Sequence, residues 1–150
     1  MPSAIQENSQ STAEIYSAFT KAWNANDLEK VVGLFHPDAT FKSPASDTAL
    51  SGAALRAYFE SMLGAMPDMS VENVGEVANS GNMLANQVVV NGTWTKPFSV
   101  GPLAGMNPTG KSARFTAAIF VEVHDGKITE CTQYYDRMTL LTQLGVIPPK

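Results

Sequence analysis

Asp136 stands between an alternating segment and a short helical segment in "DGKITECTQYYDRMTLLTQLG", residues 125–145. A carboxylate at such a junction can transfer a proton if it faces an apolar hollow, because burial destabilises its charged form and raises its pKa toward neutrality. It can equally cap the helix that follows, where its oxygens accept backbone N–H bonds worth about 0.5–2 kcal/mol. Those donors lower the pKa of the carboxyl, so the two roles oppose one another and both stay open.

Two further kinds of side chain could stabilise negative charge on a carbonyl oxygen near Asp136. Strict alternation along the last strand places Tyr134 on the same face as Asp136, whereas a β-bulge would place Tyr135 there instead. Arg114 is the only arginine in the strand region before the final turn. If it faces inward it could hold an anionic oxygen, and otherwise it is a surface group. The catalytic candidates are therefore Asp136, Tyr134 and Arg114.

Most aromatic and methionine side chains recur at regular helical or strand spacing and are interpreted first as core residues, some of which must line a cavity. Tyr58 and Trp94 are the best ligand contacts among them, because amphipathic rings tolerate a partly wet wall. The candidate substrate-binding residues are Tyr16, Phe19, Trp23, His36, Tyr58, Met62, Trp94, Phe120, Thr132 and Tyr135.

Histidine and cysteine are too few to suggest a metal centre. His36 lies at a helix end, where a lone histidine more often complements the helix dipole, and His124 lies beside a turn. Cys131 is the single cysteine, which excludes an intramolecular disulfide and a cysteine-based zinc cluster. We expect no metal and a cofactor-independent mechanism.

The composition fits one ordinary globular domain. The chain has 150 residues, of which 44% are hydrophobic and 16% charged. Its formal charge is −4 and no basic run is present, so nucleic acid is not an expected partner. The first residues lack the pattern of a signal peptide, and no apolar stretch is long enough to span a bilayer. These features predict a cytoplasmic protein that does not associate with membranes.

Hydrophobic periodicity predicts the elements that must position these side chains. Residues 1–10 are polar and aperiodic and are expected to be a flexible terminus, followed by a single domain over residues 11–150. Asp125 and Gly126 indicate a type I′ hairpin turn. We expect helices at 12–24, from Leu28 to a stop before Pro37, and at about 52–66, a short strand at 39–44, β-rich runs at 69–78, 83–98 and 112–124, a last strand at 127–135, and a closing helix at 137–144.

This order, with helices first and a meander of strands after them, predicts an α+β fold. We expect a curved antiparallel sheet packed against three N-terminal helices, with a cone-shaped cavity between the two layers. Residues 97–110 are rich in Gly and Pro and form either a mobile lid over the cavity or a plain connecting loop.

Two segments carry a family resemblance. "WNANDLEKVVGLFHPDATFKSP", residues 23–44, and "PTGKSARFTAAIFVEVHDGKITECTQYYDRMTLLTQLG", residues 108–145, resemble the nuclear transport factor two-like superfamily, and within it the SnoaL-like polyketide cyclase group. The resemblance implies a cystatin-like α+β barrel, homodimerisation through the outer face of the sheet, and Asp136 as the acid/base carboxylate of an aldol ring closure. Thr132 stands where this group frequently has a tryptophan.

Two related activities do not fit the residues. In the alignment with ketosteroid isomerases, the general base would fall at Ser43, the oxyanion-hole tyrosine at Phe19 and its partner acid near Ala118, and none of these can serve. In the alignment with limonene epoxide hydrolases, the catalytic acid would fall at Gln133, and the Arg-x-Asp signature is absent from "LANQVVV".

The leading hypothesis is a cofactor-independent acid/base enzyme that acts on a hydrophobic, carbonyl-bearing small molecule by aldol-type cyclisation, isomerisation or dehydration. The alternative is a non-catalytic module of the same fold that binds a small ligand or mediates protein association. A third possibility is an epoxide hydrolase with rearranged acids.

Overall fold

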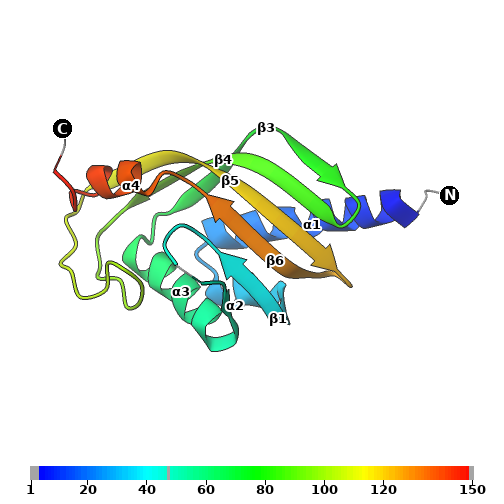
Figure 1. The fold of residues 1–150 in the computed structure, drawn as a ribbon, viewed down its shortest axis with the longest axis horizontal. Coiled ribbons are helices and arrows are strands. Elements are labelled where there is room, and N and C mark those ends of the chain that lie inside the picture. The colour runs from blue at the N-terminus through cyan, green and yellow to red at the C-terminus, as the bar shows by residue number, and fades with distance from the viewer. Residues whose placement is uncertain (1–3, 47, 149–150) are drawn as a thin grey trace.

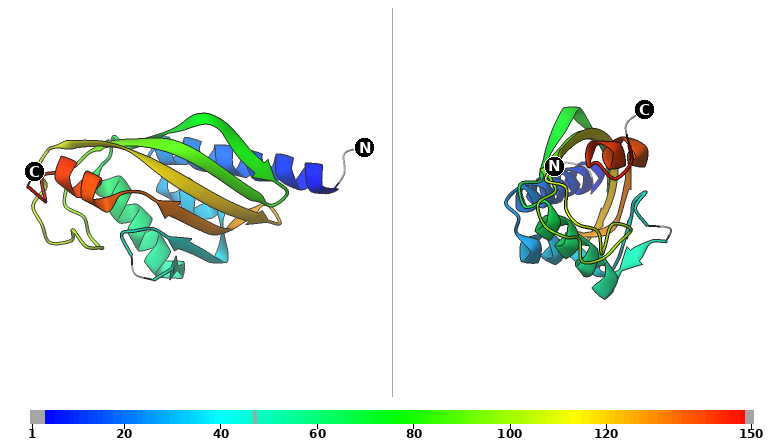
Figure 2. Two further views of the ribbon diagram at one scale, coloured as in Figure 1. Left: turned by 45° about the horizontal axis from the view of Figure 1, so that its top comes forward. Right: turned by 90° about the vertical axis from the view of Figure 1, so that its left-hand side faces the viewer.

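The computed structural model describes residues 4–46 and 48–148 (Figure 1). Three helices cover one face of a curved six-stranded sheet, as predicted, and a fourth short helix follows the last strand (Figure 2). The elements are α1 (Ala4–Asn24), α2 (Leu28–Gly33), β1 (Phe35–Lys42), β2 (Leu50–Ser51), α3 (Gly52–Ala65), β3 (Ser70–Ser80), β4 (Met83–Thr93), β5 (Ser112–His124), β6 (Lys127–Tyr134) and α4 (Arg137–Gln143).

The sheet is mixed rather than wholly antiparallel, which corrects the prediction. Its strand order is β2-β1-β6-β5-β4-β3, and β1 runs parallel to β6, with Phe41 opposite Cys131. The other neighbouring pairs are antiparallel. Hairpin turns reveal antiparallel neighbours from sequence, but β1 and β6 are far apart in the chain and no local pattern encodes their direction.

The N-terminal helix is longer than expected. α1 begins at Ala4, so residues 4–10, for which we expected a loose terminus, continue the helix, whereas residues 1–3 lie outside the described part of the chain. The segment contains good helix formers but few apolar residues, so periodicity does not detect it.

The turn between α1 and α2 joins them to the end of α3. Asp27 caps α2 by accepting a hydrogen bond of 3.2 Å from the backbone N–H of Lys30. Asn26 adopts a positive φ of 55°, and its amide donates to the carbonyls of Leu63 and Pro67, both at 3.1 Å. The helices that cover the sheet are therefore linked to one another at this corner.

The β5–β6 hairpin contains the feature that decides which side chains of β6 face the helices. The predicted type I′ turn is confirmed by positive φ angles at Asp125 and Gly126. Val123 pairs with Ile128, but Glu122 pairs with Glu130, so Thr129 is an extra residue in β6. Such a β-bulge changes which face later side chains point to.

The consequence of the bulge is visible in burial. Ile128 is fully buried, and beyond Thr129 the buried positions become Cys131 and, less completely, Gln133 and Tyr135. These odd-numbered residues face the helices, in place of the even-numbered ones that strict alternation predicts.

Candidate functional site

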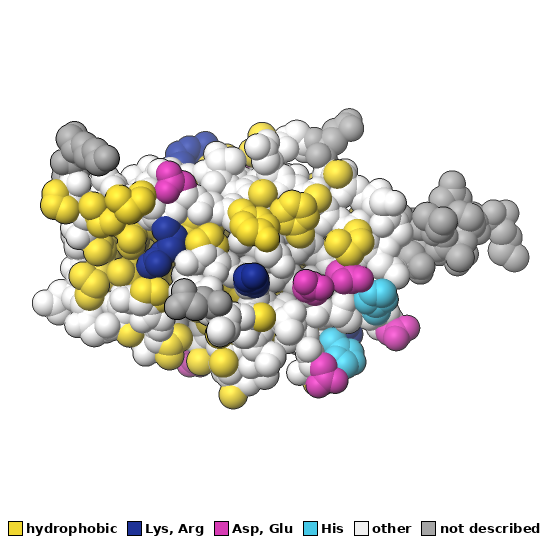
Figure 3. All heavy atoms as spheres, viewed as in Figure 1, with side chains coloured by type: hydrophobic (Ala, Val, Ile, Leu, Met, Phe, Trp, Pro, Cys, Tyr) yellow, Lys and Arg dark blue, Asp and Glu magenta, His cyan; other side chains and the backbone are white. Residues whose placement is uncertain are grey.

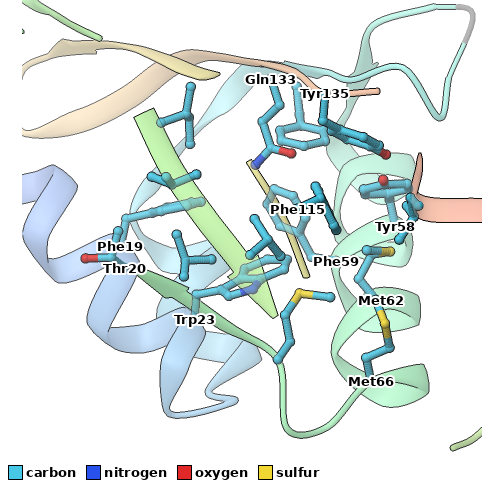
Figure 4. Close-up of a pocket in the computed structure, with 17 residues that line it drawn as sticks. Phe19, Thr20, Trp23, Tyr58, Phe59, Met62, Met66, Phe115, Gln133 and Tyr135 are labelled. Carbon is cyan, nitrogen blue, oxygen red and sulfur yellow. The ribbon is translucent and has the colours of Figure 1, made fainter. Parts of the chain in front are cut away.

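An apolar cavity, which we call the inner chamber, lies between the helices and the inner face of β3 to β6 (Figure 4). It leaves about 50 Å³ for the centres of water-sized molecules, so it is narrow. Its walls are almost entirely aromatic, aliphatic and methionine side chains: Phe19, Thr20, Trp23, Phe41, Tyr58, Phe59, Met62, Met66, Met69, Val71, Val88, Val90, Phe115, Ile119, Gln133, Tyr135 and Leu140.

A second hollow, the outer chamber, adjoins the first. It leaves about 40 Å³ for water-sized centres and lies between α3, α4 and the loop that follows β4. The two chambers share the side chains of Tyr58, Met62, Met66, Tyr135 and Leu140. Methionine side chains adapt readily to a neighbour, so this shared wall can adjust to a ligand longer than one chamber.

The loop within residues 97–110 supplies part of the outer chamber wall through Phe98 and Leu103. The buried Ser61 hydroxyl on α3 attaches this loop, because it accepts hydrogen bonds from the backbone N–H groups of Ser99 at 2.9 Å and Val100 at 3.2 Å. Residues 97–110 therefore cover part of the outer chamber. This position agrees with both a mobile lid and a plain connecting loop.

Three hydroxyl groups meet where the chambers adjoin. The Tyr58 hydroxyl lies 3.4 Å from that of the buried Ser43, and the Tyr135 hydroxyl lies near enough to both to affect their electrostatics. Figure 4 shows the two tyrosine hydroxyls pointing toward one another from α3 and from the end of β6. We call Ser43, Tyr58 and Tyr135 the hydroxyl cluster.

Burial raises the pKa of Tyr58 and of Tyr135, and the positive charge of Arg137 opposes this rise only in part. Both phenols therefore stay protonated near neutral pH. In an apolar surrounding, a protonated phenol is a hydrogen-bond donor that a carbonyl or enolate oxygen can use.

Asp136 does not face either chamber. Its side chain is exposed and caps α4, accepting hydrogen bonds of 3.0 Å from the backbone N–H of Met138 and of 3.0 Å from the Thr139 hydroxyl. The capping interpretation is confirmed, and the expectation that this carboxylate projects into a hollow is wrong. The physical reason is that α4 begins immediately after the chain leaves β6, so its first backbone N–H groups hold the carboxylate at the surface.

Tyr134 is also placed outside. Its side chain is 58% exposed on the outer face of the sheet and packs edge-on against Phe120, with ring centroids 6.0 Å apart. Thr132 pairs with Phe120 on the same face. The expectation that these three residues line the cavity is wrong. In β6, the bulge at Thr129 reverses the facing of the strand and places Tyr135 inside instead. In β5, the odd-numbered residues are the buried ones, so Phe120 lies on the outer face.

Arg114 and His36 lie at the surface. Arg114 is exposed and donates a hydrogen bond of 2.9 Å to the Asn91 side chain, so it is a surface group rather than an inward cation. His36 is exposed in β1, where its Nδ1 accepts a hydrogen bond of 3.0 Å from the backbone of Asp38.

Tyr16 and Trp94 are buried core residues that line neither chamber. The Tyr16 hydroxyl donates to Asn73 at 3.0 Å, and the Trp94 ring packs against Phe98 at 5.5 Å. The predicted binding residues that do line the inner chamber are Phe19, Trp23, Tyr58, Met62 and Tyr135.

The sequence interpretation missed several lining residues. Phe59 and Met66 share the apolar stripe of α3, and that helical spacing could have identified them. Gln133, Ser43 and Arg137 carry polar groups of the site, but each lies where only the tertiary structure, including the bulge, determines its facing.

Within residues 4–46 and 48–148, no group of three or more His, Cys, Asp or Glu side chains could hold a metal ion. No helix in this part of the chain is long and apolar enough to cross a membrane.

The helices and the curved sheet form an α+β domain with the nuclear transport factor two-like fold, and two apolar chambers lie within it. The chain belongs to the SnoaL-like polyketide cyclase family, whose model matches residues 13–144. No curated protein sequence matches the chain.

Several solved structures are similar to this one. AclR, a candidate hydroxylase from Streptomyces galilaeus, is 24% identical, with 93% of this chain and 99% of that one covered and a TM-score of 0.77. IdmH, a candidate polyketide cyclase from Streptomyces antibioticus, is 27% identical over 89% of this chain and 98% of that one, with a TM-score of 0.70. An epoxide hydrolase-like protein from M. tuberculosis is 15% identical over 92% of each chain, with a TM-score of 0.67, and shows the fold alone.

Proposed function

We propose that the protein is an enzyme that binds a hydrophobic, carbonyl-bearing small molecule in the chambers and promotes its cyclisation, isomerisation or dehydration. The observation that carries this proposal is the hydroxyl cluster, a polar group set into walls that are otherwise almost wholly apolar. Membership of the cyclase family supports the same class of substrate.

The chemistry follows from the protonation state of the two tyrosines. Aldol closure, enolisation and dehydration all develop negative charge on a carbonyl oxygen, and fixed donors in a water-poor site stabilise that charge. Tyr58 and Tyr135 supply two such donors, and Ser43 orients Tyr58. The positive charge of Arg137, which lines the outer chamber, would also stabilise negative charge on this carbonyl oxygen.

The experiment that tests this proposal compares three tyrosines. Calorimetric titration with 2-acetylnaphthalene, an apolar ketone, is expected to show binding that Tyr58→Phe and Tyr135→Phe each weaken about three- to tenfold, because each removes one hydrogen bond to the ketone. Tyr134→Phe is the matched control, since its ring lies on the outer face. Equal affinities for all four proteins would contradict the proposal.

A second candidate function is binding without catalysis. It is favoured by one observation: the described residues that line the two chambers include no carboxylate and no imidazole.

Asp136 lies in the chain between two chamber residues and is the carboxylate to which family resemblance assigns the proton transfer. Asp136→Asn keeps a capping side chain but cannot accept the proton, so turnover that survives this substitution with unchanged stability would exclude Asp136 as the base.

A further inference from the structure

Besides Thr20, whose hydroxyl donates to the Ser17 carbonyl at 3.0 Å, two polar side chains of the inner chamber lie outside the hydroxyl cluster. One is the indole N–H of Trp23, which enters from α1, and the other is the side-chain amide of Gln133, which enters from β6 (Figure 4). Both have mainly apolar neighbours in the chamber, and of the two the Trp23 nitrogen is fully enclosed, where a polar group without a partner is costly.

The Trp23 N–H is a buried donor without an acceptor. The residue is only 8% exposed, and its Nε1 has no hydrogen-bond partner among the described residues. Nearly all buried donors in folded proteins are paired, so an orphan on a cavity wall indicates that something else supplies the acceptor. Trp94 has an unpaired Nε1 as well, but it lines neither chamber, so the same argument does not extend to it.

The Gln133 amide is placed in the chamber by the bulge at Thr129. Opposite it in the sheet stands Ile119, and Phe115 also lines the chamber, so its surroundings are apolar. This amide makes no hydrogen bond to another described residue, and it is half-buried rather than fully enclosed. An amide can donate and accept, so it can bind a hydroxyl or a carbonyl oxygen.

We propose that the inner chamber binds a second oxygen function of the ligand, held by Trp23 and Gln133, at a point separate from the carbonyl held by the hydroxyl cluster. This proposal rests on the proposed function and narrows its substrate class to apolar molecules oxygenated at two separate positions. The Phe59 ring lies 5.4 Å from that of Trp23 and 6.3 Å from that of Tyr58, so one small molecule can contact both ends.

The test uses two ketones that differ by one group of similar size, 6-hydroxy-2-acetylnaphthalene and 6-methyl-2-acetylnaphthalene. We expect the hydroxyl compound to bind at least about fivefold more tightly in calorimetric titration, because its oxygen pairs groups that the methyl compound leaves unpaired. Trp23→Phe and Gln133→Leu should each bring the ratio of the two dissociation constants closer to one. Trp94→Phe, which removes the other unpaired indole, should leave it unchanged.

The outcomes separate this proposal from the one on which it rests. Equal binding of the two ketones by the unaltered protein, with binding still sensitive to Tyr58→Phe, would overturn the second recognition point and leave the carbonyl site standing. A preference that persists in both Trp23→Phe and Gln133→Leu would also overturn it. Failure of both ketones to bind would overturn the two proposals together.

Discussion

The Ser43 hydroxyl lies 3.4 Å from the Tyr58 hydroxyl, so the chain just after β1 and the middle of α3 meet at one polar contact inside an apolar wall. Both side chains are buried. The contact matters because it orients the O–H bond of a phenol whose ring is already held by Phe41 and Phe59. When Ser43 is the donor in this contact, the Tyr58 oxygen accepts and its own hydrogen remains available to a ligand.

This contact predicts coupling between the two residues. Ser43→Ala and Tyr58→Phe should each lower the free energy of unfolding by about 0.5–1.5 kcal/mol, the usual contribution of one hydrogen bond. The double variant should lose less than the sum of the two, because both changes remove the same interaction. Urea unfolding of the four proteins measures this. Strict additivity would show that the hydroxyls do not interact.

The buried thiol of Cys131 predicts an alkaline loss of stability. Burial raises the pKa of this thiol from 9.0 to about 12. The unfolded chain therefore releases the proton at a pH where the folded protein keeps it, and stability that is complete below pH 9 falls as the pH rises toward 12. The slope is about 1.4 kcal/mol per pH unit for one such group.

Urea unfolding between pH 8 and pH 11 checks this slope. The tyrosines Tyr58 and Tyr135 add to the loss only above about pH 10, the ordinary pKa of tyrosine. Cys131→Ala should therefore abolish the part of the decline between pH 9 and 10. A variant with the same decline as the unaltered protein in that interval would contradict the assignment to Cys131.

The cap of α4 predicts different effects for two substitutions of Asp136. Asp136→Ala removes the acceptor for the Met138 N–H and should lower the free energy of unfolding by about 0.5–2 kcal/mol. Asp136→Asn should have little effect, because asparagine is an equally good capping residue. Chemical denaturation of both variants measures the difference, and equal losses would argue against a capping role.

The outer face of the sheet predicts the site of homodimerisation that family resemblance implies. Figure 3 shows hydrophobic side chains gathered over this face, and Phe120 and Tyr134 are 40% and 58% exposed there. Exposed aromatic groups of this kind often mark an interface. Phe120→Glu combined with Tyr134→Glu should convert a dimer into a monomer in light scattering after size-exclusion chromatography.

Met138→Glu provides the control, because Met138 is 53% exposed but lies on α4 rather than on the sheet. It should leave the dimer intact. A monomer for the unaltered protein would contradict the dimer, and a dimer that survives the paired substitution would place its interface elsewhere.

The sequence predicted most of the architecture because the relevant signals are local. Helical spacing in α3 and the Asp125–Gly126 turn depend on neighbouring residues, so both are confirmed. The parallel pairing of β1 with β6 depends on residues far apart in the chain, and it was missed. Family resemblance gave the superfamily and the SnoaL-like group, which the family match confirms.

The site was harder to predict than the fold. Phe19, Trp23 and Met62 were found because helical periodicity defines their face. Tyr134 was assigned to the wrong side because alternation assumes an unbroken strand, and one inserted residue invalidates it. The polar groups Ser43 and Gln133 were considered only for roles that they could not perform in other enzymes, so their contribution as hydrogen-bonding groups emerged only from the structure.

The extra residue at Thr129 has a consequence for how this scaffold diversifies. Deleting Thr129 would leave Glu130 directly after Ile128 in regular alternation, so Gln133 and Tyr135 would still face the helices while the local bend of the bulge is lost. One codon can thus be gained or lost at this position while the pocket keeps the same inward-facing side chains, so the hairpin can vary in length without changing ligand recognition.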